Sequence, residues 1–89
     1  MITGSAPIDL QVLEFLKVCF CCPILEGYGL TETSGASTIT VSEDPVAGHV
    51  GGPIRCCKLR LKDVDDMNYH ATDKPYPRGE VQMKGSNIF

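Results

Sequence analysis

The sequence predicts an α/β fold in which a helix-flanked mixed sheet precedes a β-meander. Three observations predict it. Apolar residues recur at helical spacing over 8–20, a β-branched run covers 37–41, and apolar and charged residues alternate over 58–62. The chain has 89 residues, which is enough for one modest core and argues against two independent domains.

The first segment with a clear period is 8–20, which follows a β-prone start at 1–3 and a turn-forming cluster at 4–7. Asp9 is expected to cap this helix because its carboxylate can accept free backbone N–H groups, and Pro23 is expected to end it. The helix has two apolar rows: Leu13, Leu16 and Phe20, and Val12, Phe15 and Cys19. Two apolar rows need more partners than three short strands offer, which suggests a piece of a larger protein.

Two further strands are expected in the first half of the chain. A short strand-like run at 24–25 leads into a loop over 26–35 that is dense in Gly, Thr and Ser. The β-branched run at 37–41 predicts the next strand. Residues 42–52 contain Pro45 and three glycines and are expected to form a loop.

The second half predicts strands at 54–64 and 79–85, joined by a polar connection over 67–78. Aspartates at 63, 65 and 66 are expected to form the turn that ends the first of these strands, because they lack the Gly and terminal Glu of an EF-hand loop. The cations of that strand are expected to form a solvated face rather than a phosphate track: Lys58, Arg60 and Lys62.

Composition excludes several classes of function. Hydrophobic residues make up 43% and charged residues 21%, which is typical of a globular protein. The net charge of −3 argues against a nucleic-acid partner, since phosphate binding requires clustered Lys and Arg. No apolar run reaches about 18 residues, so no segment is expected to span a membrane, and no secretory signal is expected.

The five cysteines do not form a recognisable ligand set: Cys19, Cys21, Cys22, Cys56 and Cys57. Their spacing differs from the separated C-x-x-C pairs of structural zinc sites, and His49 and His70 stand at no ligand spacing from them. We expect reduced thiols that pack as small hydrophobes, with a metal or redox module as the alternative. His49 is expected to pack in a turn, with a catalytic base as the alternative, since no carboxylate stands at a readable spacing.

The segment from Gly27 to Glu32 contains the residue types of a nucleotide and metal site. Gly27 and Gly29 flank Tyr28, so a ligand could approach the backbone closely and a flat ring could stack on the aromatic side chain. A hydroxyl such as that of Thr31 can bind a phosphate oxygen, and the Glu32 carboxylate can be a ligand of Mg²⁺. By residue type alone, a Gly-rich surface turn is the more common explanation.

Four ordered segments resemble motifs of the adenylate-forming (AMP-binding) superfamily, which includes acyl-CoA synthetases. The segment 28–33 (YGLTET) is similar to its Y-G-x-T-E motif, and 4–8 (GSAPI) to its G-x-A-P-L segment. Residues 48–53 (GHVGGP) resemble its G-x-V-G-x-P segment, and 78–89 its G-E-[IV]-x-x-[RK]-G-x-x-x-F segment. The resemblance implies part of the large N-terminal domain, with the adenine and Mg²⁺ site in 1–47 and a β-rich part in 48–89.

The stretch 62–69 (KDVDDMNY) resembles eukaryotic long-chain fatty acid–CoA ligases in particular. The resemblance implies a ligase that uses ATP, Mg²⁺ and CoA to convert a long-chain fatty acid into an acyl-adenylate and then a thioester. It also implies an intracellular parent enzyme associated with a membrane of endoplasmic reticulum, peroxisome or lipid-droplet type, through regions outside this segment.

The resemblance also implies roles for individual residues. The backbone of Gly4, Ser5, Ala6 and Pro7 lines the adenine side of the pocket. Tyr28 packs on the adenine between Gly27 and Gly29. Thr31 binds the α-phosphate, and Glu32 holds Mg²⁺, which makes these two the catalytic pair.

The family's upstream phosphate loop and downstream ribose-binding Asp, hinge and catalytic Lys are not among the 89 residues. The isolated chain is therefore expected to be inactive. The alternatives are another acyl- or aryl-acid adenylating ligase and a truncated product without catalytic activity.

Overall fold

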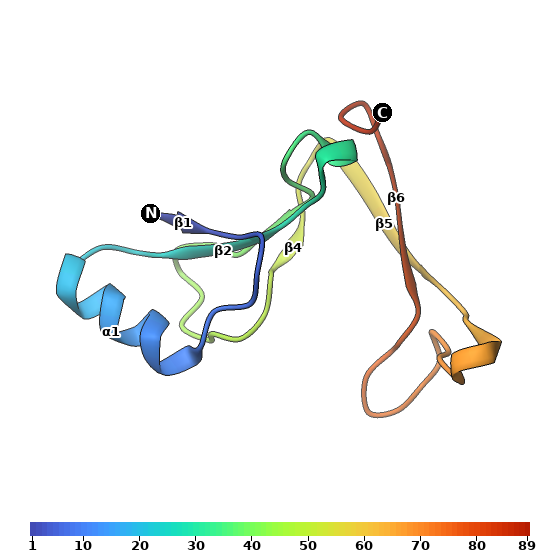
Figure 1. The fold of residues 1–89 in the computed structure, drawn as a ribbon, viewed down its shortest axis with the longest axis horizontal. Coiled ribbons are helices and arrows are strands. Elements are labelled where there is room, and N and C mark those ends of the chain that lie inside the picture. The colour runs from blue at the N-terminus through green and yellow to red at the C-terminus, as the bar shows by residue number, and fades with distance from the viewer.

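The computed structural model describes residues 1–89, which form a four-stranded sheet, a separate two-stranded sheet and one α-helix (Figure 1). The first sheet has the order β1-β2-β3-β4, with strands Ile2–Thr3, Leu25–Tyr28, Thr38–Ile39 and Gly52–Pro53. β1 runs parallel to β2, and the other two pairs are antiparallel. The sheet is therefore mixed, as the sequence predicts.

The helix α1 spans Leu10–Phe20 and begins where the capping residue predicts. The Asp9 carboxylate accepts hydrogen bonds from the backbone N–H groups of Gln11 (2.8 Å) and Val12 (3.3 Å). Cys21 ends the helix in a left-handed conformation with φ 48°, two residues before Pro23. The first helical residue is Leu10 rather than residue 8, because the N-cap itself adopts an extended conformation.

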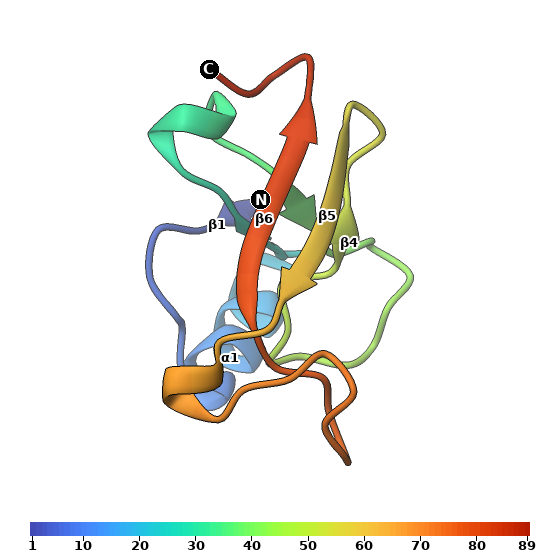
Figure 2. The same ribbon diagram turned by 90° about the vertical axis from the view of Figure 1, so that its right-hand side faces the viewer.

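The second sheet is an antiparallel pair of six-residue strands, β5 (Cys57–Lys62) and β6 (Glu80–Gly85), as Figure 2 shows. β5 begins at Cys57 rather than at residue 54, because the N–H of Cys57 donates to the Ile54 carbonyl and closes a turn there. The β-rich second half thus consists of this pair, while β4 pairs with β3 in the first sheet. The first sheet accordingly extends past residue 47.

Part of the predicted loop 26–35 is regular structure. β2 continues through Gly27 and Tyr28, which pair with Ile39 and Thr38 of β3. A 3₁₀ turn follows at Thr31–Thr33. The site segment therefore lies at the end of a strand and in the turn after it, and the interpretation of all of 26–35 as loop was wrong.

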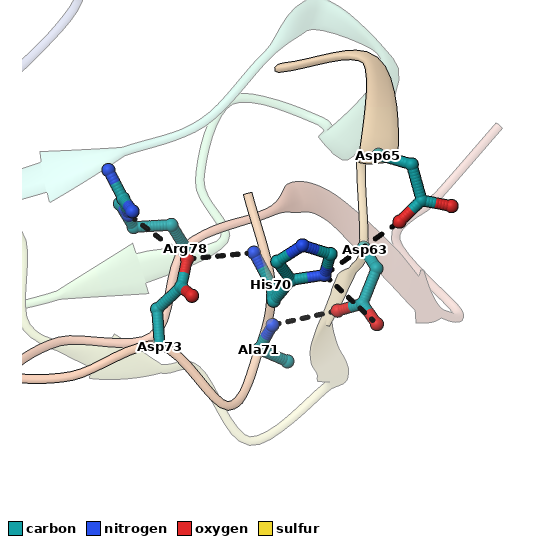
Figure 3. Close-up of polar contacts among 6 residues, drawn as sticks. All are labelled: Asp63, Asp65, His70, Ala71, Asp73 and Arg78. Carbon is teal, nitrogen blue, oxygen red and sulfur yellow. Dashed lines mark hydrogen bonds and ion pairs between the residues drawn. The ribbon is translucent and has the colours of Figure 1, made fainter. Parts of the chain in front are cut away.

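The connection between β5 and β6 is ordered by carboxylates that accept backbone hydrogen bonds (Figure 3). Asp63 accepts from the N–H of Ala71 (2.7 Å), and Asp73 accepts from the N–H of His70 (2.9 Å) and from Nε of Arg78 (3.1 Å). The predicted turn after the strand is present, with a 3₁₀ segment at Asp65–Met67.

Few residues are shielded from solvent: Leu13, Ile24, Thr33, Ser37, Thr38 and Cys57. Leu13 lies in α1 and Ile24 immediately precedes β2, while Ser37 and Thr38 lie at β3, where the Cys57 thiol at the start of β5 donates to the Ser37 carbonyl. None of the helices has both the length and the apolar character needed to cross a membrane.

Candidate functional site

The candidate site is a cavity of about 500 Å³ at the edge of the first sheet where β1 and β2 end. Parallel strands have their carboxyl ends at the same edge of a sheet, so the turn after β1 and the turn after β2 meet there. The lining comes from Thr3–Ile8, Glu26–Leu30 and Gly48–Val50. Three segments that resemble family motifs are thus brought together.

Seven of the nine predicted site residues line this cavity: Gly4, Ser5, Ala6, Pro7, Gly27, Tyr28 and Gly29. Tyr28 is half-buried, and its carbonyl accepts a hydrogen bond from the N–H of Ser37 (2.8 Å), which fixes the end of β2. Ser5 adopts a positive φ of 73°, so the turn after β1 doubles back sharply beside the cavity.

The two glycines beside Tyr28 lie so close to neighbouring backbone that a side chain there would clash or crowd it. A Cβ on Gly29 would collide with the Gly35 carbonyl oxygen and would lie 2.7 Å from Cα of Ala36. A Cβ on Gly27 would approach the Thr38 carbonyl oxygen to 3.3 Å. The sequence suggested that these glycines admit a ligand. In the structure, the space at Gly29 is taken by the chain over 35–36, which gives that glycine a packing role.

Thr31 and Glu32 do not line the cavity. Both lie in the 3₁₀ turn just beyond it, both are exposed, and their side chains make no hydrogen bond or ion pair within the chain. Their free oxygens therefore remain available to a ligand. One unpaired carboxylate fits the way Mg²⁺ is usually held, by one or two carboxylates together with substrate phosphates.

Thr33 is a structural residue of the site that the sequence did not single out. Its buried hydroxyl accepts from the N–H of Leu30 (2.8 Å) and donates to the Leu30 carbonyl (2.9 Å), which closes the 3₁₀ turn. A Thr three residues after the start of a turn is a recognisable signal for such a bond.

Residues at the end of the chain hold the same turn from outside. The Asn87 side-chain amide donates to the carbonyls of Thr33 (3.1 Å) and Ala36 (3.2 Å). The N–H of Phe89 donates to the Glu32 carbonyl (2.9 Å). The segment after β6 is therefore part of the support of the site, a long-range contact that local sequence patterns do not reveal.

His49 has a carboxylate partner, which contradicts the reasoning from spacing. Its Nε2 lies 2.9 Å from Oδ2 of Asp44, and its Nδ1 accepts from the N–H of Gly51 (3.1 Å). With Nδ1 as an acceptor, the N–H at Nε2 is the group that donates to Asp44. The expected turn packing is present, and it places His49 in the cavity wall.

No Lys or Arg lines the cavity, and Glu26 is its sole acidic residue. Oε2 of Glu26 accepts from the N–H of Gly48 at 3.4 Å, which connects the lining segment Gly48–Val50 to β2. The cavity can therefore offer an aromatic face, hydroxyls and backbone groups to a ligand.

The cysteines lie apart from the cavity. Cys57 is buried and its Sγ donates to the Ser37 carbonyl (3.2 Å), whereas Cys56 beside it is exposed. All five thiols are free, and no group of three or more His, Cys, Asp or Glu side chains could hold a metal ion.

Curated relatives resemble the chain along its whole length. Fatty acyl-CoA synthetase A of Dictyostelium discoideum is 51% identical over 89 residues, which are 100% of this chain and 13% of that protein. Peroxisomal long chain acyl-CoA synthetase 7 of Arabidopsis thaliana is 45% identical over 98% of this chain and 12% of its own. Human long-chain-fatty-acid–CoA ligase 1 is 44% identical over 100% of this chain and 12% of its own length. The chain thus spans about an eighth of the length of these relatives.

Solved structures share the fold at modest identity. A malonyl-CoA ligase in a complex with methylmalonyl-CoA and AMP superimposes with a TM-score of 0.73 at 31% identity, over 99% of this chain and 18% of that one. The adenylation domain of carboxylic acid reductase from Segniliparus rugosus, in complex with AMP, superimposes with a TM-score of 0.70 at 30% identity. The match covers 99% of this chain and 12% of that one. The family model described as AMP-binding enzyme matches residues 1–89, so the chain belongs to the AMP-binding enzyme family.

Proposed function

We propose that this chain is part of the AMP-binding domain of an ATP-dependent long-chain fatty acid–CoA ligase. The observation that supports this most is the cavity of about 500 Å³ into which three family-like segments converge. Relatives at 44–51% identity that are named long-chain or fatty acyl-CoA synthetases support the substrate class.

In this proposal the cavity receives the adenine of ATP. The backbone of Gly4–Pro7 forms one wall, and Tyr28 packs its ring on the base while Gly27 and Gly29 hold the strand end in place. Backbone groups and an aromatic face suit a neutral purine, and the absence of cations in the lining keeps the phosphates outside it.

The phosphates would then extend from the cavity toward the exposed 3₁₀ turn. The Thr31 hydroxyl would donate to the α-phosphate, and the Glu32 carboxylate would hold Mg²⁺. A carboxylate oxygen of the fatty acid attacks the α-phosphorus, and the bond to pyrophosphate breaks. The CoA thiol then attacks the acyl carbon and AMP leaves. A donor fixed beside the α-phosphate stabilises the charge that develops on its oxygens.

A chimera tests the proposal in a complete enzyme, with residues 1–89 replacing the matching segment of the Dictyostelium synthetase. We expect it to exchange pyrophosphate into ATP with palmitate as substrate. Thr31→Val should lower this rate on the order of a hundredfold, because it removes one donor to the transition state. Thr31→Ser retains the hydroxyl and should recover most of the activity.

Glu32→Gln should raise the Mg²⁺ concentration needed for half-maximal exchange, since an amide is a weaker ligand than a carboxylate. Thr72→Val, at an exposed position in the connection between β5 and β6, is the matched control and should change neither quantity. Equal losses in Thr31→Val and Thr72→Val would contradict the assignment.

A second candidate is a ligase for another acyl or aryl acid, favoured by the structural similarity to malonyl-CoA ligase. Exchange by the chimera with malonate or benzoate but not palmitate would favour it. The truncated, non-catalytic product predicts a chimera that is folded and inactive with all three acids. An intracellular, membrane-associated parent stays a prediction of the family resemblance, to which the peroxisomal relatives lend partial support.

A further inference from the structure

A second hollow lies at the end of the β5–β6 pair where β5 begins and β6 ends. Its volume is about 490 Å³, and it shares no lining residue with the candidate nucleotide cavity. We call it the cationic hollow, and its lining is Arg55, Cys56, Cys57, Lys58, Lys84, Gly85 and Ser86. It contains three of the eight Lys and Arg residues and no acidic residue, in a chain with a net charge of −3.

The strand register places two of these cations directly opposite each other. Lys58 of β5 pairs with Lys84 of β6, so both side chains leave the same face of the sheet. Directly opposed residues have Cβ atoms about 5 Å apart, and like charges at that separation destabilise the pair. The sheet therefore carries an electrostatic cost at this position.

The remainder of the same face carries polar partners for its cations. Nε of Arg60 donates to Oε1 of Gln82 (2.7 Å), and Nε2 of Gln82 donates to Oε2 of Glu80 (3.1 Å). Lys62 stands opposite Glu80 in the register. Glu80 thus places one carboxylate beside the cations at this end of the face, whereas no carboxylate stands opposite Lys58 or Lys84 at the other end. The sequence alone predicted one uniform solvated face.

Four polar side chains of the cationic hollow have no partner within the chain. Arg55, Lys58 and Lys84 take part in no side-chain hydrogen bond or ion pair, and neither does the Ser86 hydroxyl. Arg55 lies in the turn that precedes β5, and Ser86 follows β6. Two ammonium groups, a guanidinium and a hydroxyl are thus the donors available in one concave surface.

We propose that the cationic hollow binds a phosphate monoester in its dianionic form. Such a group carries a charge of about −1.5 to −2 near neutral pH and three acceptor oxygens, so it can bridge Lys58 and Lys84 and remove their mutual repulsion. The planar fork of Arg55 suits two of its oxygens, and the lysines act as point charges. The phosphate group can belong to a soluble molecule or to a lipid headgroup.

Equilibrium dialysis with radiolabelled inorganic phosphate tests this on the chimera described above. Lys84→Glu is the informative variant, because it replaces a like-charge pair with an opposite-charge pair. The β5–β6 pair should become at least as stable, while phosphate binding should weaken about tenfold or more. Phosphate bound elsewhere contributes equally to both proteins and cancels in the comparison.

Lys74→Glu makes the same change of charge in the connection, away from the hollow, and should bind phosphate as the parent does. Thermal unfolding of each protein shows that it is folded. Unchanged binding by Lys84→Glu, or an equal loss in Lys74→Glu, would overturn the proposal. Neither outcome depends on adenylation, so failure here is distinct from failure of the proposed function.

Vesicles distinguish the two sources of the phosphate. Phosphatidylcholine vesicles with 10% phosphatidic acid present a monoester headgroup, and vesicles of phosphatidylcholine alone present none. If the parent chimera cosediments with the first and not the second, and Lys84→Glu does not, the site takes a lipid headgroup. If phosphate binds and the vesicles do not, the site takes a soluble monoester.

Discussion

At the scale of single residues, several glycines of the motifs are required by backbone packing, whether or not a ligand is bound. Gly29 leaves room for the backbone of residues 35–36. Gly51 has a positive φ of 74°, and a Cβ on it would collide with the Ile39 carbonyl oxygen. Gly4 lies against Gly27, whose carbonyl oxygen would be 3.2 Å from an added Cβ. These glycines are therefore needed where backbone segments of the first sheet and its turns lie in close contact.

Gly29→Ala is expected to destabilise the chimera by about 1–3 kcal/mol, because the added methyl group collides with backbone that cannot rotate away. Gly52→Ala is the matched control: nothing lies within 4 Å of its added Cβ, and its φ is not positive. Urea unfolding of both variants measures the difference. A loss in Gly52→Ala as large as that in Gly29→Ala would contradict the packing role.

At the scale of elements, the connection between β5 and β6 is held by a chain of polar contacts rather than by a core. Nδ1 of His70 lies 3.9 Å from Asp63 and 3.8 Å from Asp65 (Figure 3). The Arg78 guanidinium lies 5.1 Å from the ring centre of Tyr69. These side chains are partly exposed, so individual pairs add little stability. The order of the connection rests mainly on the backbone hydrogen bonds that its aspartates accept.

The connection between β5 and β6 should lose order in acid, when Asp73 is protonated and its hydrogen bonds weaken. The hydrogen bond from the His70 N–H, aided by Arg78, holds the pKa of Asp73 below its usual 3.8, although partial desolvation opposes this. A lowered pKa means that the carboxylate's contribution is complete above the unfolded value and is lost as pH falls through the folded one. An NMR pH titration of the His70 amide, which donates to the Asp73 carboxylate, should show a midpoint below 3.8, and Asp73→Asn should abolish it. A midpoint at or above 3.8 would contradict this.

The elements differ in how much of them local sequence determines. α1 could be predicted with its cap because its period and the Asp9 bonds are local. β4 could not, because Gly52–Pro53 has no strand propensity and pairs with β3 only through a turn at Gly51. Seven residues that line the 500 Å³ cavity could be named from motifs, whereas the contact of His49 with Asp44 and the support from Asn87 come from long-range or loop contacts that no motif encodes.

At the scale of the whole molecule, the chain is open. Its accessible surface is 6792 Å², whereas a folded monomer of its mass exposes about 5,100 Å². Its radius of gyration is 14.7 Å, against about 12 Å for a compact domain of this length. On α1, Leu13 is 1% exposed but Val12 and Phe15 are 48% and 66% exposed, and Cys19 is exposed as well. The second apolar row of the helix is thus left without a partner, as its two-row pattern predicts.

The same substitution on α1 should therefore act differently in the isolated chain and in the chimera. Phe15→Gln removes an exposed aromatic side chain from the isolated 89 residues and should not lower their stability. In the chimera, where we expect the rest of the domain to cover this face, it should cost about 3–5 kcal/mol. Glu14→Gln, on the exposed polar side, is the control and should be neutral in both. Hydrogen exchange of the α1 amides measures each effect, and an equal response of Phe15→Gln in both proteins would show that α1 has the same exposed face in the longer enzyme.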